Sequence, residues 1–403
     1  MQIIRGLLGI GTLLGLCYLL SWNRRAIRLR PVVVGLLLQV LLGLLIFKTR
    51  AGEAFFQELA AFTLRFFEFS YRGSEFVFGP LGKPSEGGVF YLAFQALPIL
   101  IYFSAVMAVL YHLGVMQVVV YAFSRIMGRL LGVSGAESMA VTGEILVGMT
   151  ESPLLVRPYI ERMTRSELVA LMTGGFATIA GTVMGIYMGF VGEQYAPFLL
   201  AGSVMAAPAT FVAAKIVLPE TEVPVTGKEF HLRVERQGAN LLDAIAIGVR
   251  DGLGLALNIA AMLIAFYSLI ALLNWPLEAW LATSIQGIFG VLLSPLAWCI
   301  GVDWSDAANF GRLLGTKIAL NEWIAYDDLK QMIQRGELSE RSITLATFAL
   351  CGFANFGSIG VTLGGIGQLA PGRRQDLARL AFRSMLAGAI ASCMTAAVAG
   401  MVL

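Results

Sequence analysis

Stretches of about 20 mostly apolar residues recur along the whole chain, and they constrain its fold more than any other feature. A helix of that length crosses roughly 30 Å of hydrocarbon, where every backbone polar group must find its partner within the protein. Of the 403 residues, 57% are hydrophobic and 14% are charged, against roughly 25% charged in a soluble domain. The alternation typical of a membrane barrel is not seen. The sequence therefore predicts an all-α polytopic membrane protein.

We expect about eight transmembrane helices. They cover 4–22, 32–48, 90–113, 166–190, 195–217, 252–274, 341–366 and 378–402. The first apolar run is followed by a basic cluster, so we interpret it as a membrane helix and not as a signal peptide.

The distribution of basic residues predicts the orientation, because Lys and Arg favour the cytoplasmic side. Basic connections alternate with acidic or nearly neutral ones, and the basic ones lie at 23–31, 124–165, 215–236 and 371–383. We therefore expect a multi-pass protein of the cytoplasmic membrane with both termini outside. The net charge of +3 is small, and it gives no support to binding of nucleic acid.

Three segments do not suit simple spans. Residues 48–69 place charged and apolar residues at helical spacing, which indicates an amphipathic helix at the membrane interface. Residues 134–160 and about 280–330 are too interrupted by Gly, Pro and carboxylates to cross singly. We expect each to form a re-entrant hairpin, the first opening to the cytoplasm and the second to the outside.

The two hairpin regions are followed by similar sequences. Glu151 precedes GGFATIAGT at 174–182, and Glu322 precedes CGFANFGSIG at 351–360. The same order in opposite orientation indicates an inverted repeat, and hence alternating access around a site at the midplane. On this basis we divide the chain into five parts, of which the third and the fifth are the two repeats. The parts are 1–89, 90–133, 134–218, 219–279 and 280–403.

Glu151 and Glu322 are the first candidates for the site, because a charge at the centre of a membrane helix costs roughly 2.5 to 3.5 kcal/mol. Gly148 and Pro153 favour a chain break beside Glu151. The alternative is that each carboxylate is neutral, or is paired with Lys317 or an Arg.

Further polar residues could face the same cavity. Glu144 precedes Glu151 by seven residues, which places both on one side if the turns between them are helical. Asn355 and Ser358 are spaced i, i+3 on the predicted seventh span, and Thr178 lies on the fourth. The alternatives are a water-facing Glu144 and helix packing for the other three. The two histidines and four cysteines predict neither a zinc site nor a catalytic relay.

At three stretches the sequence resembles the concentrative nucleoside transporters. GTKIALNEWIAY at 315–326 is similar to the family signature G-x-K-x3-N-E-F-V-A-Y, LVGMTESPLLVRPYI to its hairpin, and GFANFGSIG to its seventh-span motif. The resemblance runs from FVFG at 76–79 to the last helix. It implies a homotrimer in the lipid bilayer that moves a nucleoside by cation symport in an elevator-like motion. It implies neither enzymatic activity nor a cofactor beyond the coupling ion.

The resemblance also implies site residues. Around the substrate it places Thr150, Glu151, Glu322, Phe353, Asn355 and Ser358. Glu322, Asn355 and Ser358 would hold ribose hydroxyls. A sodium site would use the carbonyls of Val147 and Ile179 and the hydroxyls of Thr150 and Thr178.

Two positions depart from the family pattern. Met149 stands where the family commonly has Gln, and a thioether cannot donate a hydrogen bond to the base. Glu144 stands where the sodium site commonly has Asn. A carboxylate there could strengthen sodium binding or take up a proton, and the sequence leaves both open.

Three alternatives remain at this stage. The first is a carrier of the same fold for another ribosylated or nucleobase-like solute, favoured by Met149. The second is a membrane-embedded hydrolase with Glu151 and Glu322 as acid and base, although no nucleophile or metal ligands accompany them. The third is a passive channel.

Overall fold

The computed structural model describes residues 2–83, 91–226 and 238–403, so the predicted start at 90 and part of the 219–240 loop lie outside it. Within these ranges all regular structure is helical, which confirms the all-α membrane fold. By length and composition, six described segments could cross a membrane. They are Gln2–Leu20 (α1), Leu29–Lys48 (α2), Leu92–His112 (ending in α4, Leu97–His112), Glu193–Val217 (ending in α11, Ala196–Val217), Leu241–Leu281 (α12) and Pro371–Val402 (containing α18, Arg374–Val402).

Two further spans were predicted as continuous helices, and this was wrong. The fourth is divided into α9 (Arg165–Ala177) and α10 (Gly181–Val191), and the seventh into α16 (Glu340–Ala349) and α17 (Phe356–Leu369). In the second break Gly352 has φ of +111°, a conformation that ends an α-helix. The total of eight continuous spans is therefore not reached in the described part of the chain.

The two hairpin regions consist of short helices joined by turns. The first contains α6 (Gly135–Glu144), α7 (Ser152–Leu155) and α8 (Arg157–Ile160), and the second contains α13 (Ile285–Ile300), α14 (Trp304–Ala319) and α15 (Glu322–Arg335). A capping box starts α6, with the Ser134 hydroxyl accepting from the Glu137 N–H. The bend between α13 and α14 is 116°. Re-entry into the membrane stays a prediction.

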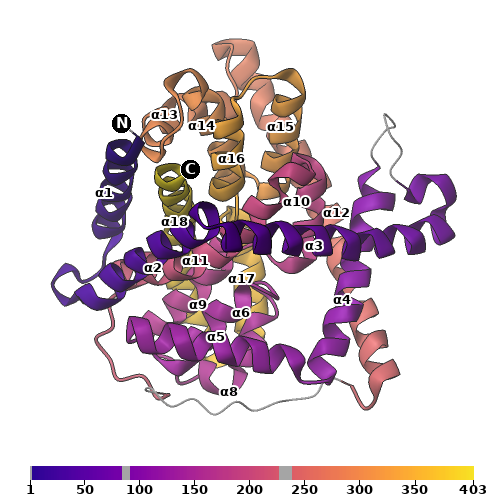
Figure 1. Ribbon diagram of the computed structural model, residues 1–403, viewed down its shortest axis with the longest axis horizontal. Coiled ribbons are helices and arrows are strands. Elements are labelled where there is room, and N and C mark those ends of the chain that lie inside the picture. The colour runs from indigo at the N-terminus through magenta and orange to yellow at the C-terminus, as the bar shows by residue number, and fades with distance from the viewer. Residues whose placement is uncertain (1, 84–90, 227–237) are drawn as a thin grey trace.

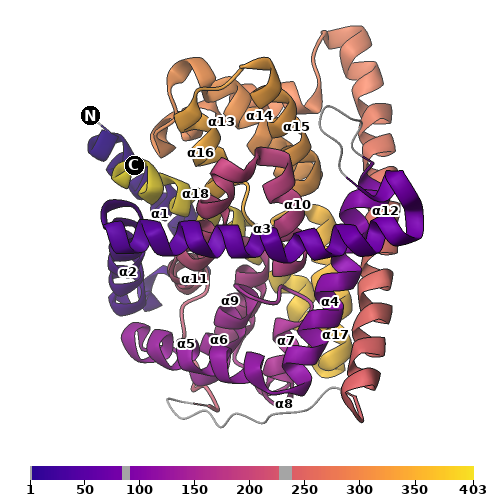
Figure 2. The same ribbon diagram turned by 45° about the vertical axis from the view of Figure 1, so that its right-hand side comes forward.

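The amphipathic segment forms one helix, α3 (Arg50–Phe78), which extends beyond the predicted end at 69. It crosses the molecule at a large angle to α4 and α12 in both views (Figures 1 and 2). Its buried face includes Phe56 and Phe67, while its charged residues point outward. A second amphipathic helix, α5 (Val115–Leu131), leads into α6.

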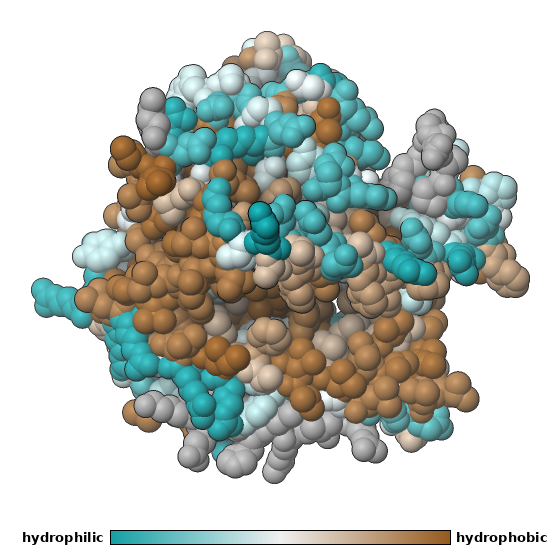
Figure 3. All heavy atoms as spheres, viewed as in Figure 1, coloured by the Kyte–Doolittle hydropathy of each residue, from teal (hydrophilic) through white to brown (hydrophobic). Residues whose placement is uncertain are grey.

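The helices of the two predicted repeats lie mostly at opposite ends of the molecule. Helices α13 to α16 lie at one end of the molecule and α5 to α9 at the other (Figures 1 and 2). Between them α11 and α18 form the core, with 78% and 83% of their most apolar windows buried, whereas α12 has 6% buried and lies at the periphery. A broad hydrophobic surface separates hydrophilic regions at the top and the lower left (Figure 3).

Candidate functional site

The two broken helices meet at their breaks in the centre of the molecule. A Cβ added to Gly352 would lie 2.5 Å from the carbonyl oxygen of Phe176 and 2.6 Å from the carbonyl carbon of Ala177. The chain between α16 and α17 therefore passes directly against the end of α9. Only glycine permits this approach, because it has no Cβ and tolerates the positive φ.

Lys317 stabilises the break that follows α16. Its ammonium, 1% exposed, donates to the carbonyls of Ala349 at 2.9 Å and Cys351 at 3.1 Å and to the Ser392 hydroxyl at 2.8 Å. A helix C-terminus leaves carbonyls without partners and carries partial negative charge, which a cation compensates. The alternative that Glu151 or Glu322 is paired with Lys317 or an Arg is not found, since no described ion pair includes either glutamate.

Glu322 is the centre of a buried polar network. It is 3% exposed at the first turn of α15. Its Oε1 accepts from the Tyr187 hydroxyl at 3.0 Å, and its Oε2 accepts from the Asn355 Nδ2 at 2.8 Å. Tyr187 also stacks on Tyr326, with ring centroids 4.4 Å apart. Sequence reasoning missed Tyr187, because a tyrosine inside an apolar run gives no signal of its partner.

Asn355 caps α17 instead of lying within a helix, so its predicted helical i, i+3 spacing to Ser358 is wrong. The pair is nevertheless joined, because the Asn355 Oδ1 accepts from the Ser358 N–H at 2.8 Å. This cap leaves the amide nitrogen directed at Glu322. Phe353 lies half-buried in the break itself.

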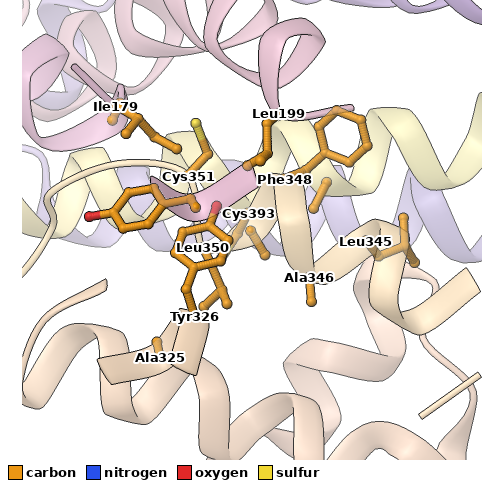
Figure 4. Close-up of a cluster of buried hydrophobic side chains, with 14 of the residues drawn as sticks. Ile179, Leu199, Ala325, Tyr326, Leu345, Ala346, Phe348, Leu350, Cys351 and Cys393 are labelled. Carbon is orange, nitrogen blue, oxygen red and sulfur yellow. The ribbon is translucent and has the colours of Figure 1, made fainter. Parts of the chain in front are cut away.

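Apolar side chains pack around the break between α16 and α17. Cys351 lies beside Ile179, Leu350 and Cys393, and Tyr326 points toward them (Figure 4). Cys351, Cys393 and Cys17 are buried and free, and Cys299 is free and half-buried, so none is paired in a disulfide. Ile179 of the first break and Cys351 of the second thus belong to one buried apolar cluster.

The connection between α6 and α7 carries Met149, Thr150 and Glu151. The residues between Glu144 and Glu151 are not helical, so the condition under which both carboxylates would project to one side is not met. Gly148 has φ of +96°, and a Cβ there would overlap the Ala180 side chain in the break between α9 and α10. Glu151 is half-buried, and its Oε2 is buried without a hydrogen-bond partner. Thr150 is exposed.

Glu144 lies at the end of α6 with 1% of its surface exposed. Its carboxylate packs against Gly174, where a Cβ would overlap Oε2, and against Gly175. Oε2 has no hydrogen-bond partner in the described structure. A buried carboxylate oxygen without a partner is costly, and a bound cation or proton would satisfy it.

Oxygen atoms for a small cation lie on the same two segments. Val147 and Ile179 lie outside helices, and no hydrogen bond to either carbonyl is found within the described ranges. The Thr178 hydroxyl donates to the Gly174 carbonyl at 2.9 Å, which leaves its lone pairs free. The donor set fits an oxygen-liganded cation.

The two groups of candidates approach one break from two sides. Gly148, beside Met149 and Thr150, contacts Ala180, while Gly352, beside Phe353, contacts Phe176 and Ala177. A solute between the connection that carries Met149 and the break that carries Phe353 would thus meet carboxylates, an amide and hydroxyls. Such a set is suited to a polyhydroxylated molecule.

Three family models match the chain. They are described as "Na+ dependent nucleoside transporter N-terminus" over residues 8–81, "Nucleoside recognition" over 93–194 and "Na+ dependent nucleoside transporter C-terminus" over 198–400. Together they cover most of the sequence.

Individual relatives agree with these matches. The Bacillus subtilis "Uncharacterized transporter YutK" is 41% identical over all of both chains. The rat "Sodium/nucleoside cotransporter 1" is 41% identical over 97% of this chain and 62% of its own length. Solved structures of a protein named CNTnw, 39% identical, match 100% of this chain, with TM-scores of 0.92 for an inward-facing substrate-bound state, 0.92 for an outward-facing variant and 0.94 for an intermediate. The inward-facing and outward-facing matches each cover 98% of the CNTnw chain, and the intermediate covers 99%.

Proposed function

Because this chain belongs to the concentrative, Na+-dependent nucleoside transporter family, we propose that it carries nucleosides into the cell by symport with sodium or protons. The observation that carries the proposal is the buried network of Glu322 with Asn355, which presents carboxylate and amide groups where the breaks of two helices meet. Two carboxylate oxygens and an amide can accept from and donate to the paired hydroxyls of a ribose.

The transported solute would lie between the two turns, with Met149, Thr150 and Glu151 on one side. Glu322, Phe353, Asn355 and Ser358 would surround it from the other side. The cation would bind at Glu144, Val147, Thr150, Thr178 and Ile179. Sodium or a proton at Glu144 would remove the cost of its unpartnered buried oxygen.

The proposed motion is an elevator-type one in a cytoplasmic membrane with both termini outside. Parts 134–218 and 280–403 would move, and parts 1–89, 90–133 and 219–279 would form a fixed scaffold. A homotrimer agrees with the charged outer face of α3, which includes exposed Glu58, Arg65 and Glu68 and crosses a largely hydrophobic surface (Figure 3). A second subunit or trapped water suits that face better than lipid tails do.

A binding measurement on purified protein tests the substrate class. We expect saturable binding of labelled uridine or adenosine that unlabelled nucleosides displace, whereas free ribose and free bases displace it weakly. Displacement by a free base alone, with nucleosides inactive, would favour the alternative of a nucleobase carrier. The relatives are transporters and not enzymes, which argues against the hydrolase alternative.

Replacing Glu144 by Asn is expected to shift the coupling ion toward sodium, because an amide offers an oxygen ligand but cannot take up a proton at neutral pH. Uptake by the variant should depend less on pH and more on sodium than uptake by the parent. The measurement is initial uptake into proteoliposomes under separate sodium and pH gradients. Unchanged profiles for both ions would show that Glu144 does not carry a coupling proton.

Replacing Met149 by Gln is expected to change the relative affinities for different nucleosides by about two- to twelvefold, because a new amide can bond a base with roughly 0.5–1.5 kcal/mol. Competition of uridine, cytidine, adenosine and inosine for uptake measures the ranking. The matched control is Leu155→Met, at the half-buried last residue of α7. An identical ranking in Met149→Gln and the parent would show that position 149 does not contact the base.

A further inference from the structure

A cavity of about 320 Å³ lies at the junction of α2, α5, α6 and α11, and several charged side chains line it. Its size falls at the lower end of small-ligand sites, roughly 300–1,000 Å³. None of its lining residues belongs to the candidate substrate or cation site. The charged and hydroxyl groups that line it are Arg28, Arg30, Ser134, Glu137, Lys215 and Glu220.

The inner wall of this cavity carries more negative than positive charge. The Lys215 ammonium lies 2.5 Å from the Glu137 carboxylate and 3.9 Å from that of Glu220. All three side chains are at least nine-tenths buried, at 5%, 2% and 9% exposure. One ammonium faces two carboxylates, so a second ammonium would find an uncompensated negative charge there.

The mouth of the cavity carries positive charge. Arg28 is exposed and makes no hydrogen bond or ion pair with any residue that the structure describes. Arg30 is held in place, because its Nη2 donates to the Arg129 carbonyl at 2.9 Å. Guanidinium groups bind phosphate oxygens through paired N–H donors. The cavity thus places a cationic rim above an anionic wall.

We propose that this cavity binds the headgroup of a zwitterionic phospholipid whose ammonium carries protons. The phosphate would lie at Arg28 and Arg30, and the ammonium would reach Glu137 and Glu220. Basic pockets between helices on the cytoplasmic side are suited to lipid headgroups. The two charges of such a headgroup match the two regions of the cavity in sign and order.

An apolar stripe beside the rim favours a lipid over a free phosphate ester as the ligand. Leu29, Val33 and Leu37 are 73%, 48% and 63% exposed on α2, and their spacing of four places them on one helix face. The stripe begins between Arg28 and Arg30 and continues along the helix. An acyl chain attached to a bound headgroup would cover it.

Native mass spectrometry of the purified full chain with added lipids tests this proposal. With acyl chains matched, we expect phosphatidylethanolamine to bind more tightly than phosphatidylcholine, whose trimethylated ammonium has no N–H donor, and than phosphatidylglycerol, which has no ammonium. Arg28→Gln should weaken phosphatidylethanolamine binding about tenfold, the effect of losing one charge-assisted hydrogen bond of roughly 1.5 kcal/mol.

Arg25→Gln is the matched control, since Arg25 is an exposed arginine of the same connection that does not line the cavity. We expect it to leave phosphatidylethanolamine binding within twofold of the parent. Equal weakening by both variants would show diffuse attraction and overturn the proposal. Equal binding of phosphatidylcholine would also overturn it, as would displacement of the lipid by free phosphoethanolamine at the same concentration.

Discussion

Uridine uptake by a Glu322→Gln variant is expected to fall by a factor of about 100 or more. Each hydrogen bond to a charged acceptor contributes roughly 1.5–3 kcal/mol, and two ribose hydroxyls would lose the charged acceptor together. The side chain keeps its shape, so the bonds from Tyr187 and Asn355 can persist in part. Initial uptake rates in proteoliposomes, normalised to the amount of reconstituted protein, measure the effect.

Asp327→Asn is the matched control for Glu322→Gln, because Asp327 is an exposed carboxylate on the same helix, α15. We expect its uptake to stay within about twofold of the parent, as surface substitutions usually change little. Parent-like rate and KM in Glu322→Gln would remove Glu322 from the substrate site.

The Gly352→Ala variant is expected to lose stability by about 2–6 kcal/mol, combining the strain of a positive φ with overpacking. Its Cβ would meet the Phe176 carbonyl oxygen at 2.5 Å, and a backbone atom in a buried break cannot move aside easily. The apparent Tm of the purified protein in detergent measures the loss.

Gly360→Ala provides the comparison for Gly352→Ala. Gly360 lies within α17, five residues after the second break, and nothing lies within 4 Å of a Cβ added to it. An alanine in that helix should leave the Tm unchanged or raise it slightly. Equal Tm values for the two variants would contradict the close crossing of the two broken helices.

Hydropathy was sufficient to locate most of the continuous spans. Within a few residues, α1, α2 and α11 begin and end where apolar runs of spanning length do. It did not predict the length of α12, which extends over Leu241–Leu281 around an expected core of 252–274. A helix continues outside the hydrocarbon wherever helix propensity allows, so an apolar window gives only the minimum length of the helix.

The broken helices could not be predicted from composition. Residues 166–190 and 341–366 remain apolar through their breaks, and Gly and Asn are tolerated in membrane helices when neighbours satisfy the backbone. The break after α16 depends on a partner that is distant in sequence, because the carbonyls at the end of α16 are satisfied by Lys317 on α14. Such a contact leaves no periodicity in the sequence.

The site was predicted by chemistry and resemblance together. A buried carboxylate identified Glu322 as a candidate, while its proximity to Asn355 came from the family resemblance and is now seen as a 2.8 Å hydrogen bond. Tyr187 was missed, because nothing in its own neighbourhood indicates that it donates to a residue 135 positions away. The substrate and cation roles of all these candidates, Glu322 and Asn355 included, remain predictions.

Uphill uptake of a labelled nucleoside into proteoliposomes tests the central claim most directly. With uridine or adenosine at equal concentration on both sides, we predict net accumulation inside when an inward sodium or proton gradient is imposed. The accumulation should collapse when an ionophore dissipates the gradient and should be absent in Glu322→Gln. If neither nucleoside accumulates under either gradient, the chain is not a cation-coupled nucleoside carrier.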